Sequence, residues 1–499
     1  MLVSTTATAA APDFYWEAPA RLSRGVGAYP QALRTAGRVV AIWQENIATT
    51  ERGSAWLSLA SYGADGGVAR RDRFAGPFVY SGDAPVLFSV AADGNGTMVV
   101  AVSSGELSIS IYRSKDGGVS FEAPVVIETL EAGVAPRIFT KTGGGWYLFV
   151  TRSQVFSRPQ AGAAGSATYE SLSIFYSRSE DGSSWSAFSP FVGGEVGLDP
   201  NFLPTAASTD GADIVVFQTL SGGDRPSYQL YSTTTTDGGA TWSAPRRVTD
   251  FIDPVQGARR AAADFDNQRP HLALVGGSLW LTWERRLLSG PAQIYAARLG
   301  LDGATIPGSP ERVTLGQGNC SEPRIFSIGG AGSSVEAEEP AISWFDDRRG
   351  GSRVYAAFRA GTLWNERDLS GRSQGDGAFG RAVYAKNGLY AFWQTGRGAT
   401  SSVIGMIPDT TARAPDVSGA DFEPGAPSRR SRANVRWAVP PDSSGILGFS
   451  YLWSRDPAAE PPKTAMILET QTRAAFDADA DGDWYFTIRA QDYAGNWSP

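Results

Sequence analysis

The chain has 499 residues, a length that suits at least two domains, or one large closed architecture with a smaller domain attached. Charged residues make up only 19% of it, whereas it holds 58 glycines, 30 prolines and 15 tryptophans. This composition is typical of many short strands joined by tight turns. The net charge of −7 comes without a lysine- or arginine-rich run, which excludes the electrostatic footprint of a nucleic-acid-binding protein. We therefore expect an all-β protein without a nucleic-acid partner.

Cys320 is the only cysteine and His271 the only histidine. A disulfide and a Cys/His zinc site are thereby excluded, and any chemistry must rest on carboxylates, arginines and tyrosines. We expect no metal and no cofactor. No apolar stretch approaches the length of a membrane span, so the chain is not expected to cross a membrane.

The first residues, 1–12, include a run of Ser, Thr and Ala from Ser4 to Ala11. Such a run is typical of the small-residue end of a secretory signal peptide. We expect a signal remnant, and with it a secreted, periplasmic or cell-surface location. A disordered N-terminus without a targeting role is the alternative.

One unit of sequence recurs about every 50 to 70 residues. Each unit opens with an apolar strand. In six units a proline stands at this opening, and in the seventh a glycine does; they are Pro30, Pro85, Pro136, Pro204, Pro270, Pro323 and Gly380. A second apolar strand follows and ends near Trp43, Val102, Phe149, Phe217, Trp283, Trp344 or Trp393. A four-stranded unit cannot bury both of its faces alone, so neighbours must stack and the ring must close. The repeat predicts a β-propeller over residues 13–410, with seven blades or, alternatively, six.

Three units carry a sharper turn motif, at residues 114–121, 179–185 and 235–242. Its Asp can accept hydrogen bonds from the turn's backbone, its Gly tolerates positive φ, and its aromatic residue buries against the blade. The motif resembles the Asp-box of sialidase-like β-propellers. We assign a structural role to the residues that match it: Asp116, Gly118, Phe121, Asp181, Trp185, Asp237, Gly239 and Trp242.

A second domain is predicted over residues 411–499, where the repeat has stopped. Its segment 482–496 resembles the penultimate strand and following turn of fibronectin type III-like modules, and Phe486, Ile488 and Ala490 would face the core of a small β-sandwich. The chain ends where the last strand of such a module would begin, so we expect a piece of a longer polypeptide. The alternating aspartates in 477–483 resemble the start of a calcium loop, but Ile488 stands where the final Glu would be, which favours a plain acidic turn.

The Asp-box turns lie on one face of a propeller, so the segments that enter the first strands and follow the second strands lie on the other. Polar groups gather there, and we predict a ligand site from them. Its candidate ligand-binding residues are Asp266, Arg269, Arg285, Asp347 and Arg348. The alternative is that these residues tie neighbouring blades together.

The resemblance to sialidases implies three arginines that hold a sugar carboxylate, a Tyr–Glu pair, and an Asp acid/base. Arg269, Arg285 and Arg348 are candidates for the arginines, Glu284 for the base, and Tyr295 or Tyr355 for the nucleophile. The family's early [FY]-R-I-P strand is absent, because the first unit has Tyr29-Pro30 without the arginine. Pro136-Arg137-Ile138 and Pro323-Arg324-Ile325 carry its elements in another order.

The function expected first is therefore recognition of a glycan or an extracellular protein by the face opposite the Asp-boxes. The missing arginine strand favours recognition over catalysis. A sialidase-like exo-glycoside hydrolase is the alternative, and a structural subunit of a surface assembly is the third possibility.

Overall fold

The computed structural model describes residues 13–45, 52–63, 67–81, 87–103, 107–130, 134–159, 166–192, 198–221, 226–251, 265–287, 290–329, 338–371, 376–385 and 388–499. The chain divides into two compact units, and Ala20–Gly405 belongs to unit 1, whereas Asp13–Pro19 and Met406–Pro499 form unit 2. The predicted signal remnant, residues 1–12, lies outside the described residues.

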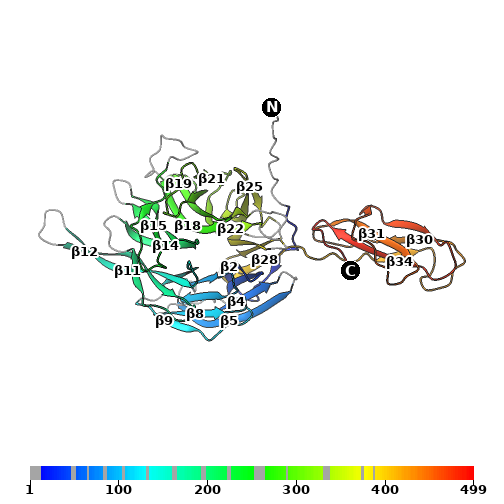
Figure 1. Cartoon of the computed structure of the whole chain (residues 1–499), viewed down its shortest axis with the longest axis horizontal. Coiled ribbons are helices and arrows are strands. Elements are labelled where there is room, and N and C mark those ends of the chain that lie inside the picture. The colour runs from blue at the N-terminus through cyan, green and yellow to red at the C-terminus, as the bar shows by residue number, and fades with distance from the viewer. Residues whose placement is uncertain are drawn as a thin grey trace, which may run out of the picture. The chain divides into compact units, whose positions relative to one another are not determined.

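The described part of unit 1 holds seven four-stranded antiparallel sheets (Figure 1). The first three are β2 (Gly27–Thr35), β3 (Arg38–Glu45), β4 (Arg52–Tyr62), β5 (Val68–Ser81); β6 (Leu87–Ala92), β7 (Met98–Ser103), β8 (Ser108–Ser114), β9 (Val125–Glu128); and β10 (Ala135–Thr140), β11 (Trp146–Pro159), β12 (Ser166–Ser179), β13 (Ser189–Val192).

The next three sheets repeat this order of strands. They are β14 (Leu198–Ser208), β15 (Asp213–Ser221), β16 (Ser227–Thr235), β17 (Arg246–Arg247); β18 (Phe265–Val275), β19 (Ser278–Leu287), β20 (Gln293–Leu299), β21 (Glu311–Arg312); and β22 (Cys320–Ile328), β23 (Glu339–Asp346), β24 (Arg353–Ala360), β25 (Leu363–Asp368).

The seventh sheet combines both ends of unit 1. Its strands β26 (Gly377–Ala385), β27 (Gly388–Thr395) and β28 (Ser402–Met406) come late in the chain, and β1 (Ala20–Arg21) completes it. Ala20 pairs with Gly405 and Arg21 with Ile404. The first strands of the seven sheets contact one another in cyclic order, and β26 returns to β2, so the sheets form a closed ring. The fold is all-β and of the β-propeller kind.

The core of unit 1 lies between neighbouring sheets, where the middle parts of the second strands are buried. Trp43, Trp283, Trp344 and Trp393 stand at matching places on four of these strands and are 0% exposed. Each of these large side chains contributes several kcal/mol of hydrophobic stabilisation, on the order of 2–3 kcal/mol. The aromatic marker of the repeat is thus the residue that packs one sheet on the next.

A β-bulge recurs in five of the first strands, at Ala28/Gln31, Phe202/Thr205, Gln268/His271, Ser321/Arg324 and Ala378/Arg381. Each bulge contains a non-glycine residue with φ between 50° and 54°, followed by Pro or Gly; these residues are Tyr29, Leu203, Arg269, Glu322 and Phe379. Such a φ costs on the order of 1–3 kcal/mol and persists only where neighbouring structure holds it. In these five sheets the Pro or Gly that opens the unit therefore stands in the bulge.

The three turns that resemble Asp-boxes share a pattern of hydrogen bonds and join third to fourth strands. In the turn after β12, Asp181 accepts hydrogen bonds from the backbone N–H groups of Ser183 and Ser184, both at 2.8 Å. Asp116 and Asp237 accept equivalent bonds in the other two turns. The aromatic residues of the motif pack against the sheets: Phe121 stacks on Phe74, and Trp185 and Trp242 join buried clusters.

Unit 2 contains two three-stranded sheets in its described residues. One holds β29 (Val417–Ala420), β30 (Arg432–Trp437) and β33 (Arg473–Asp477), and the other holds β32 (Ile467–Leu468), β31 (Ile446–Ser454) and β34 (Tyr485–Asp492). The two sheets share one core around Trp437 and Phe449, to which the predicted core residues Phe486, Ile488 and Ala490 all contribute.

Helical structure is minimal: the described residues contain a short 3₁₀ turn, η3 (Gly398–Thr400). None of the helical structure in the described ranges is long and apolar enough to cross a membrane.

Candidate functional site

The centre of the ring is built from one equivalent position in each of the seven first strands. In six sheets this residue pairs with the residue directly before the buried marker of the second strand, and in the third sheet it pairs with the marker Phe149 itself. The seven residues are Gln31, Ser89, Arg137, Thr205, His271, Arg324 and Arg381. We call them the ring residues.

Four ring residues link their own sheet to the next one by a hydrogen bond. Gln31 Nε2 donates to Phe88 O at 2.7 Å. The other three accept from a backbone N–H: Ser89 from Ile138 at 3.1 Å, Thr205 from Leu272 at 3.0 Å, and His271 Nδ1 from Ile325 at 3.1 Å. These four side chains hold the ring together.

The side chain of His271 is therefore used in a link between two sheets of the ring. Its Nδ1 accepts a hydrogen bond, so the imidazole is neutral and carries its proton on Nε2. Burial, together with three nearby arginines, holds the pKa of His271 well below its usual value. The one histidine of the chain is therefore a link between sheets rather than an acid or base at neutral pH.

The other three ring residues are arginines, and they do not bind the next sheet. Arg324 and Arg381 each donate to the carbonyl of the residue before them, Pro323 and Gly380, at 2.9 Å. Arg137 makes no hydrogen bond or ion pair with the described residues. All three are partly accessible.

The arginines are close enough to perturb one another. Burial and the neighbouring Arg324 lower the pKa of Arg137 to about 10. Burial and the same neighbour lower the pKa of Arg381 to about 9. The shifts express the cost of holding like charges together in an enclosed place. The cations remain protonated at neutral pH, and their repulsion is stored in the fold.

Two carboxylates, Glu284 and Glu322, stand beside the arginines. Glu284 Oε2 pairs with Arg269 Nη1 at 2.8 Å, and Glu322 Oε2 lies 3.9 Å from Arg381 Nη2. The four central guanidiniums therefore face two carboxylates. Arg137 and Arg324 form no ion pair with the described residues, although Glu322 acts on both through its charge. The centre carries an excess of positive charge.

Glu284, the predicted base, also serves the bulges. Its Oε1 accepts the backbone N–H of Glu322 at 2.7 Å. In other sheets the same bond is made by glutamine: Gln218 accepts from Arg269, and Gln394 accepts from Tyr29. Burial raises the pKa of Glu284, and Arg269 opposes that rise. A glutamine oxygen is enough to accept this N–H in the other sheets. Glutamate has a second oxygen, and that of Glu284 forms the ion pair with Arg269.

Among the residues predicted to bind or to react, Arg285, Tyr295 and Tyr355 lie in the core. Arg285 is 2% exposed, lies over the ring of Phe265 at 3.7 Å, and donates to Asn267 Oδ1 at 2.9 Å. Tyr295 and Tyr355 are 5% and 4% exposed and pack on the tryptophans of their sheets. In the described structure all three side chains are therefore packed between sheets.

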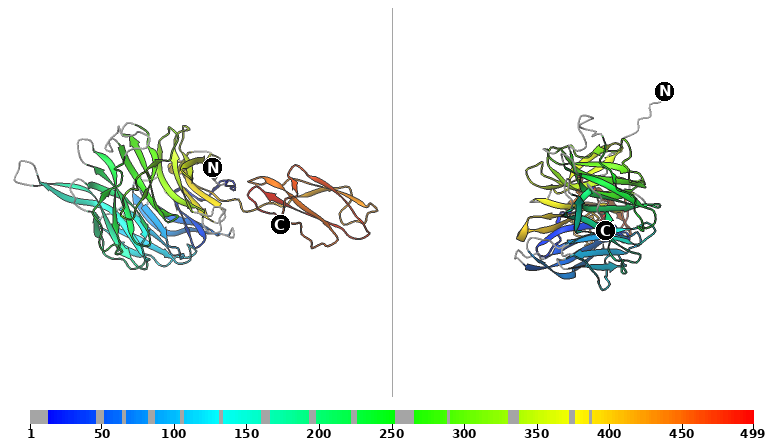
Figure 2. Two further views of the ribbon diagram at one scale, coloured as in Figure 1. Left: turned by 45° about the horizontal axis from the view of Figure 1, so that its top comes forward. Right: turned by 90° about the vertical axis from the view of Figure 1, so that its left-hand side faces the viewer.

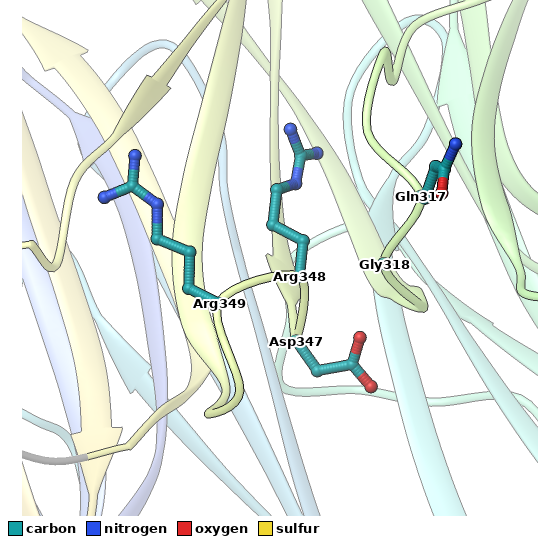
Figure 3. A pocket seen from close by; sticks show the side chains of 5 residues that line it. All are labelled: Gln317, Gly318, Asp347, Arg348 and Arg349. Atoms are coloured by element: carbon teal, nitrogen blue, oxygen red, sulfur yellow. The ribbon is translucent and has the colours of Figure 1, made fainter.

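Asp347 and Arg348 line a hollow of about 560 Å³ together with Gln317, Gly318 and Arg349 (Figure 3). The hollow's groups are already engaged. Asp347 Oδ1 accepts the N–H of Asn319 at 2.7 Å, and Arg348 is held between Asp346 and Glu366 at 2.5 Å each. Ion pairs and hydrogen bonds of Asp347 and Arg348 thus hold the loop after β23 in place, which agrees with the alternative that these residues serve the structure.

Asp266 also uses both of its carboxylate oxygens in contacts within unit 1. Its Oδ1 accepts the backbone N–H of Tyr228 at 2.9 Å, and its Oδ2 pairs with Arg286 at 3.4 Å. Of the five predicted ligand-binding residues, Arg269 alone belongs to the centre of the ring.

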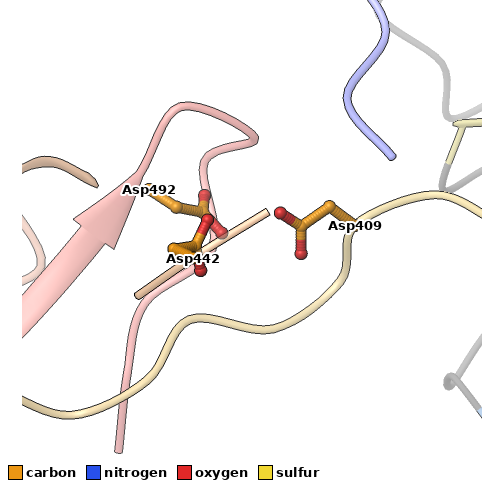
Figure 4. A group of neighbouring side chains, drawn as sticks. All are labelled: Asp409, Asp442 and Asp492. Atoms are coloured by element: carbon orange, nitrogen blue, oxygen red, sulfur yellow. The ribbon is translucent and has the colours of Figure 1, made fainter. Parts of the chain in front are cut away.

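Unit 2 holds three converging carboxylates, those of Asp409, Asp442 and Asp492, within 4.8 Å of one another (Figure 4). Carboxylate oxygens are the ligands that calcium prefers. Neighbouring groups satisfy them, since Asn496 donates twice to Asp492 and the loop after Asp442 donates to Asp442. The aspartates of 477–483 are not among these three. Nothing beyond the carboxylates themselves points to an ion.

The sequence reasoning missed the ring arginines, although it noted two of them. The signal that finds them is the residue after the opening Pro or Gly of each unit: aligning the openings places Arg137, Arg324 and Arg381 in one column with His271.

No protein-family model and no curated protein sequence matches the chain. Solved structures are similar to it at low identity. A protein of unknown function from Dyadobacter fermentans is 13% identical, with a TM-score of 0.43, over 79% of this chain and 97% of that one. An α-L-arabinanase from Penicillium chrysogenum is 16% identical, with a TM-score of 0.42, over 66% and 94%. A Trypanosoma rangeli sialidase is 10% identical, with a TM-score of 0.40, over 97% and 87%. Likenesses of this size carry no argument about activity.

Proposed function

We propose that unit 1 is a seven-bladed β-propeller that recognises an acidic sugar, whose carboxylate binds at the centre of the ring. One observation carries the proposal: four guanidiniums converge there on only two carboxylates. Enclosed cations without counter-ions are costly, and a bound carboxylate offsets that cost. Unit 2 is, in this proposal, a small β-sandwich that acts as a spacer, and the protein works outside the cytoplasm.

The ring arginines suit this role because the fold does not use them elsewhere. Arg137 has no hydrogen-bond partner among the described residues. Arg324 and Arg381 each donate there to the carbonyl of the preceding residue, and their other N–H groups could donate to a ligand. A planar guanidinium matches a carboxylate in two parallel hydrogen bonds.

The experiment is calorimetric titration of the full chain with D-galacturonate and N-acetylneuraminate, with D-galactose as the neutral counterpart. We expect the acidic sugars to bind at least tenfold more tightly than galactose, and to weaken as salt is added. Equal affinity for galacturonate and galactose would refute the proposal.

The double variant Arg137→Gln/Arg324→Gln should lose the preference for acidic sugars. Because it removes like charges from an enclosed centre, its melting temperature should equal or exceed that of the wild type, which separates lost binding from lost folding. The matched control is Arg349→Gln, since Arg349 is exposed and pairs only loosely with Asp368 at 3.7 Å. The control should bind as the wild type does.

Glycoside hydrolysis is the second candidate, and the position of Tyr29 favours it. Burial raises the pKa of the Tyr29 phenol, and the charge of Glu322 raises it further, which supports a tyrosine and a carboxylate acting together. A raised pKa opposes activation of a nucleophile, so we rank recognition first. A fluorogenic sialoside tests the alternative: turnover that is abolished in Tyr29→Phe establishes it, and its absence from a folded wild type removes it.

A further inference from the structure

Five of the first strands carry a bulge residue of positive φ, two positions before the ring residue of the same strand. We call these five side chains the rim residues; they are Tyr29, Leu203, Arg269, Glu322 and Phe379. All five are exposed or partly exposed. A strained backbone that repeats at exposed side chains is the kind of feature that positions a binding site.

The rim residues lie toward one opening of the ring. In β2, β22 and β26 the rim residue is the third residue of the strand, close to where the chain enters it. The other end of β2 lies by a turn that resembles an Asp-box, since a Cβ at Gly117 would be 3.7 Å from Thr35. β2 and β26 contact one another, although they come from opposite ends of unit 1 (Figures 1 and 2). The rim residues therefore gather at the opening opposite those turns.

Charges connect the rim to the ring arginines. Glu322 Oε2 lies 3.9 Å from Arg381 Nη2 in the next sheet. Burial lowers the pKa of Arg324, the charge of Glu322 opposes this shift, and the charge of Arg269 adds to it. Burial raises the pKa of Tyr29, and the charge of Glu322 adds to that rise. A ligand held by the ring arginines would therefore also meet the rim.

The rim combines aromatic and charged side chains. Tyr29 and Phe379 come from neighbouring sheets and pack edge to face, with ring centroids 4.9 Å apart. Phe345 supports Phe379 from another sheet at 6.2 Å. Both rim aromatics stay partly exposed, so part of their surface is open to a ligand. Arg269 and Glu322 bring charge from two other neighbouring sheets.

This combination fits a sugar acid better than a simple anion or a neutral sugar. A small anion would satisfy the arginines but leave the aromatic surface in water. A neutral sugar would cover the aromatic surface but leave the excess positive charge unbalanced. A pyranose with a carboxylate offers an anion, an apolar C–H face for aromatic rings, and hydroxyls for charged groups.

We propose that Tyr29 and Phe379 form an aromatic wall that binds the apolar face of the sugar ring, while the ring arginines bind its carboxylate. Arg269 and Glu322 bind hydroxyls of the same sugar. The rim is thus the part of the site that selects a sugar acid among carboxylates. This inference rests on the function proposed for the ring arginines.

The test is calorimetric titration of the full chain with D-galacturonate, N-acetylneuraminate and acetate, a carboxylate without a sugar ring. We expect one of the acidic sugars to bind at least tenfold more tightly than acetate. In Tyr29→Leu/Phe379→Leu the ratio of the two affinities should fall by about tenfold, and in Phe379→Leu by about threefold. Leucine suits this backbone because Leu203 occupies the equivalent bulge at φ 52°.

The matched control is Phe202→Leu/Tyr228→Leu. It makes the same change in an aromatic pair that also packs edge to face, with centroids 5.7 Å apart, but that is not part of the rim. The control should keep the wild-type ratio. Thermal unfolding of each variant confirms that it is folded.

The outcomes separate the two proposals. Acidic sugars that bind no more tightly than acetate, yet more tightly than galactose, overturn the aromatic wall and leave the ring site standing. A wild-type ratio in the folded leucine variants, or the same loss of ratio in the control, also overturns the wall. So does an equal weakening of sugar and acetate, because the change would then act on the arginines. Acidic sugars that bind no better than galactose overturn both proposals.

Discussion

Replacing His271 with asparagine should remove a pH-dependent part of the stability of unit 1 and leave the ring intact. Asparagine Oδ1 lies close to the place of histidine Nδ1, so it can accept the N–H of Ile325 that His271 accepts at 3.1 Å. His271→Ala leaves that N–H without an acceptor and opens a cavity. We expect the free energy of unfolding at neutral pH to fall by about 2–4 kcal/mol in the alanine variant and by far less in the asparagine variant.

The sign of the pH effect follows from the depressed pKa of His271. Below pH 6.5 the unfolded chain binds a proton that the folded chain does not, so the free energy of unfolding falls as the pH decreases. The slope is about 1.4 kcal/mol per pH unit until the folded pKa is reached. For a unit of several hundred residues this corresponds to about 2 °C in melting temperature per pH unit.

Differential scanning calorimetry at pH 7.5 and pH 5.5 measures the effect on the wild type and both variants. Because the chain has one histidine, and the carboxylates are common to all three proteins, the difference between wild type and His271→Asn isolates this group. Between pH 7.5 and pH 5.5 the melting temperature of the wild type should fall by about 2 °C more than that of His271→Asn. Equal losses, or an alanine variant as stable as the asparagine variant at pH 7.5, would refute the reasoning.

Three further predictions concern the sheets of unit 1. Glu284→Gln keeps an oxygen that accepts the N–H of Glu322 but loses the ion pair with Arg269, so its melting temperature should fall below that of the wild type, whereas that of Glu284→Ala, which loses both, should fall several degrees further; equal losses in thermal unfolding would contradict this. Asp181→Ala should lower the free energy of unfolding by about 1 kcal/mol in urea at pH 7. Because the turn depresses the pKa of this carboxyl, the difference from the wild type should shrink as the pH falls below about 4, and a difference that stays constant would argue against this reasoning. Gly239→Ala should lose about 1–3 kcal/mol, because φ is +80° there and a Cβ would lie 2.7 Å from the Tyr147 ring; an unchanged urea midpoint would show that the turn relaxes.

The architecture was predictable from the sequence because its signals are local and repeated. The proline-led openings and the buried tryptophans recur with the sheets, and the Asp-box residues are neighbours in the chain whose hydrogen bonds stay within one turn. In unit 2, the alternation of Phe486, Ile488 and Ala490 predicted which face of the strand meets the core, and all three residues join it.

The site was harder to predict because it depends on contacts between sheets. Arg285 follows a second strand and was expected at the surface, yet it lies between the rings of Phe251 and Phe265. Its polarity gave no sign of these aromatic neighbours, which come from other parts of the chain. Arg137 was noted only as a misplaced motif element. Its place beside Arg324 depends on how the first strands of different sheets meet at the centre of the ring, and no single repeat contains that information.

The ring position explains how one fold can carry both closure and recognition. Seven equivalent residues face the centre, and four of them, such as Thr205 and His271, are used to bind the next sheet. The ring also closes through the pairing of β1 with β28 and through contacts between all first strands, so it does not need a link at every position. The three positions that carry no link hold Arg137, Arg324 and Arg381. A side chain there can vary without opening the ring. Arginine at these positions raises the electrostatic cost of an enclosed centre, which Glu284 and Glu322 offset in part and which, under the proposed function, an anionic ligand would offset further.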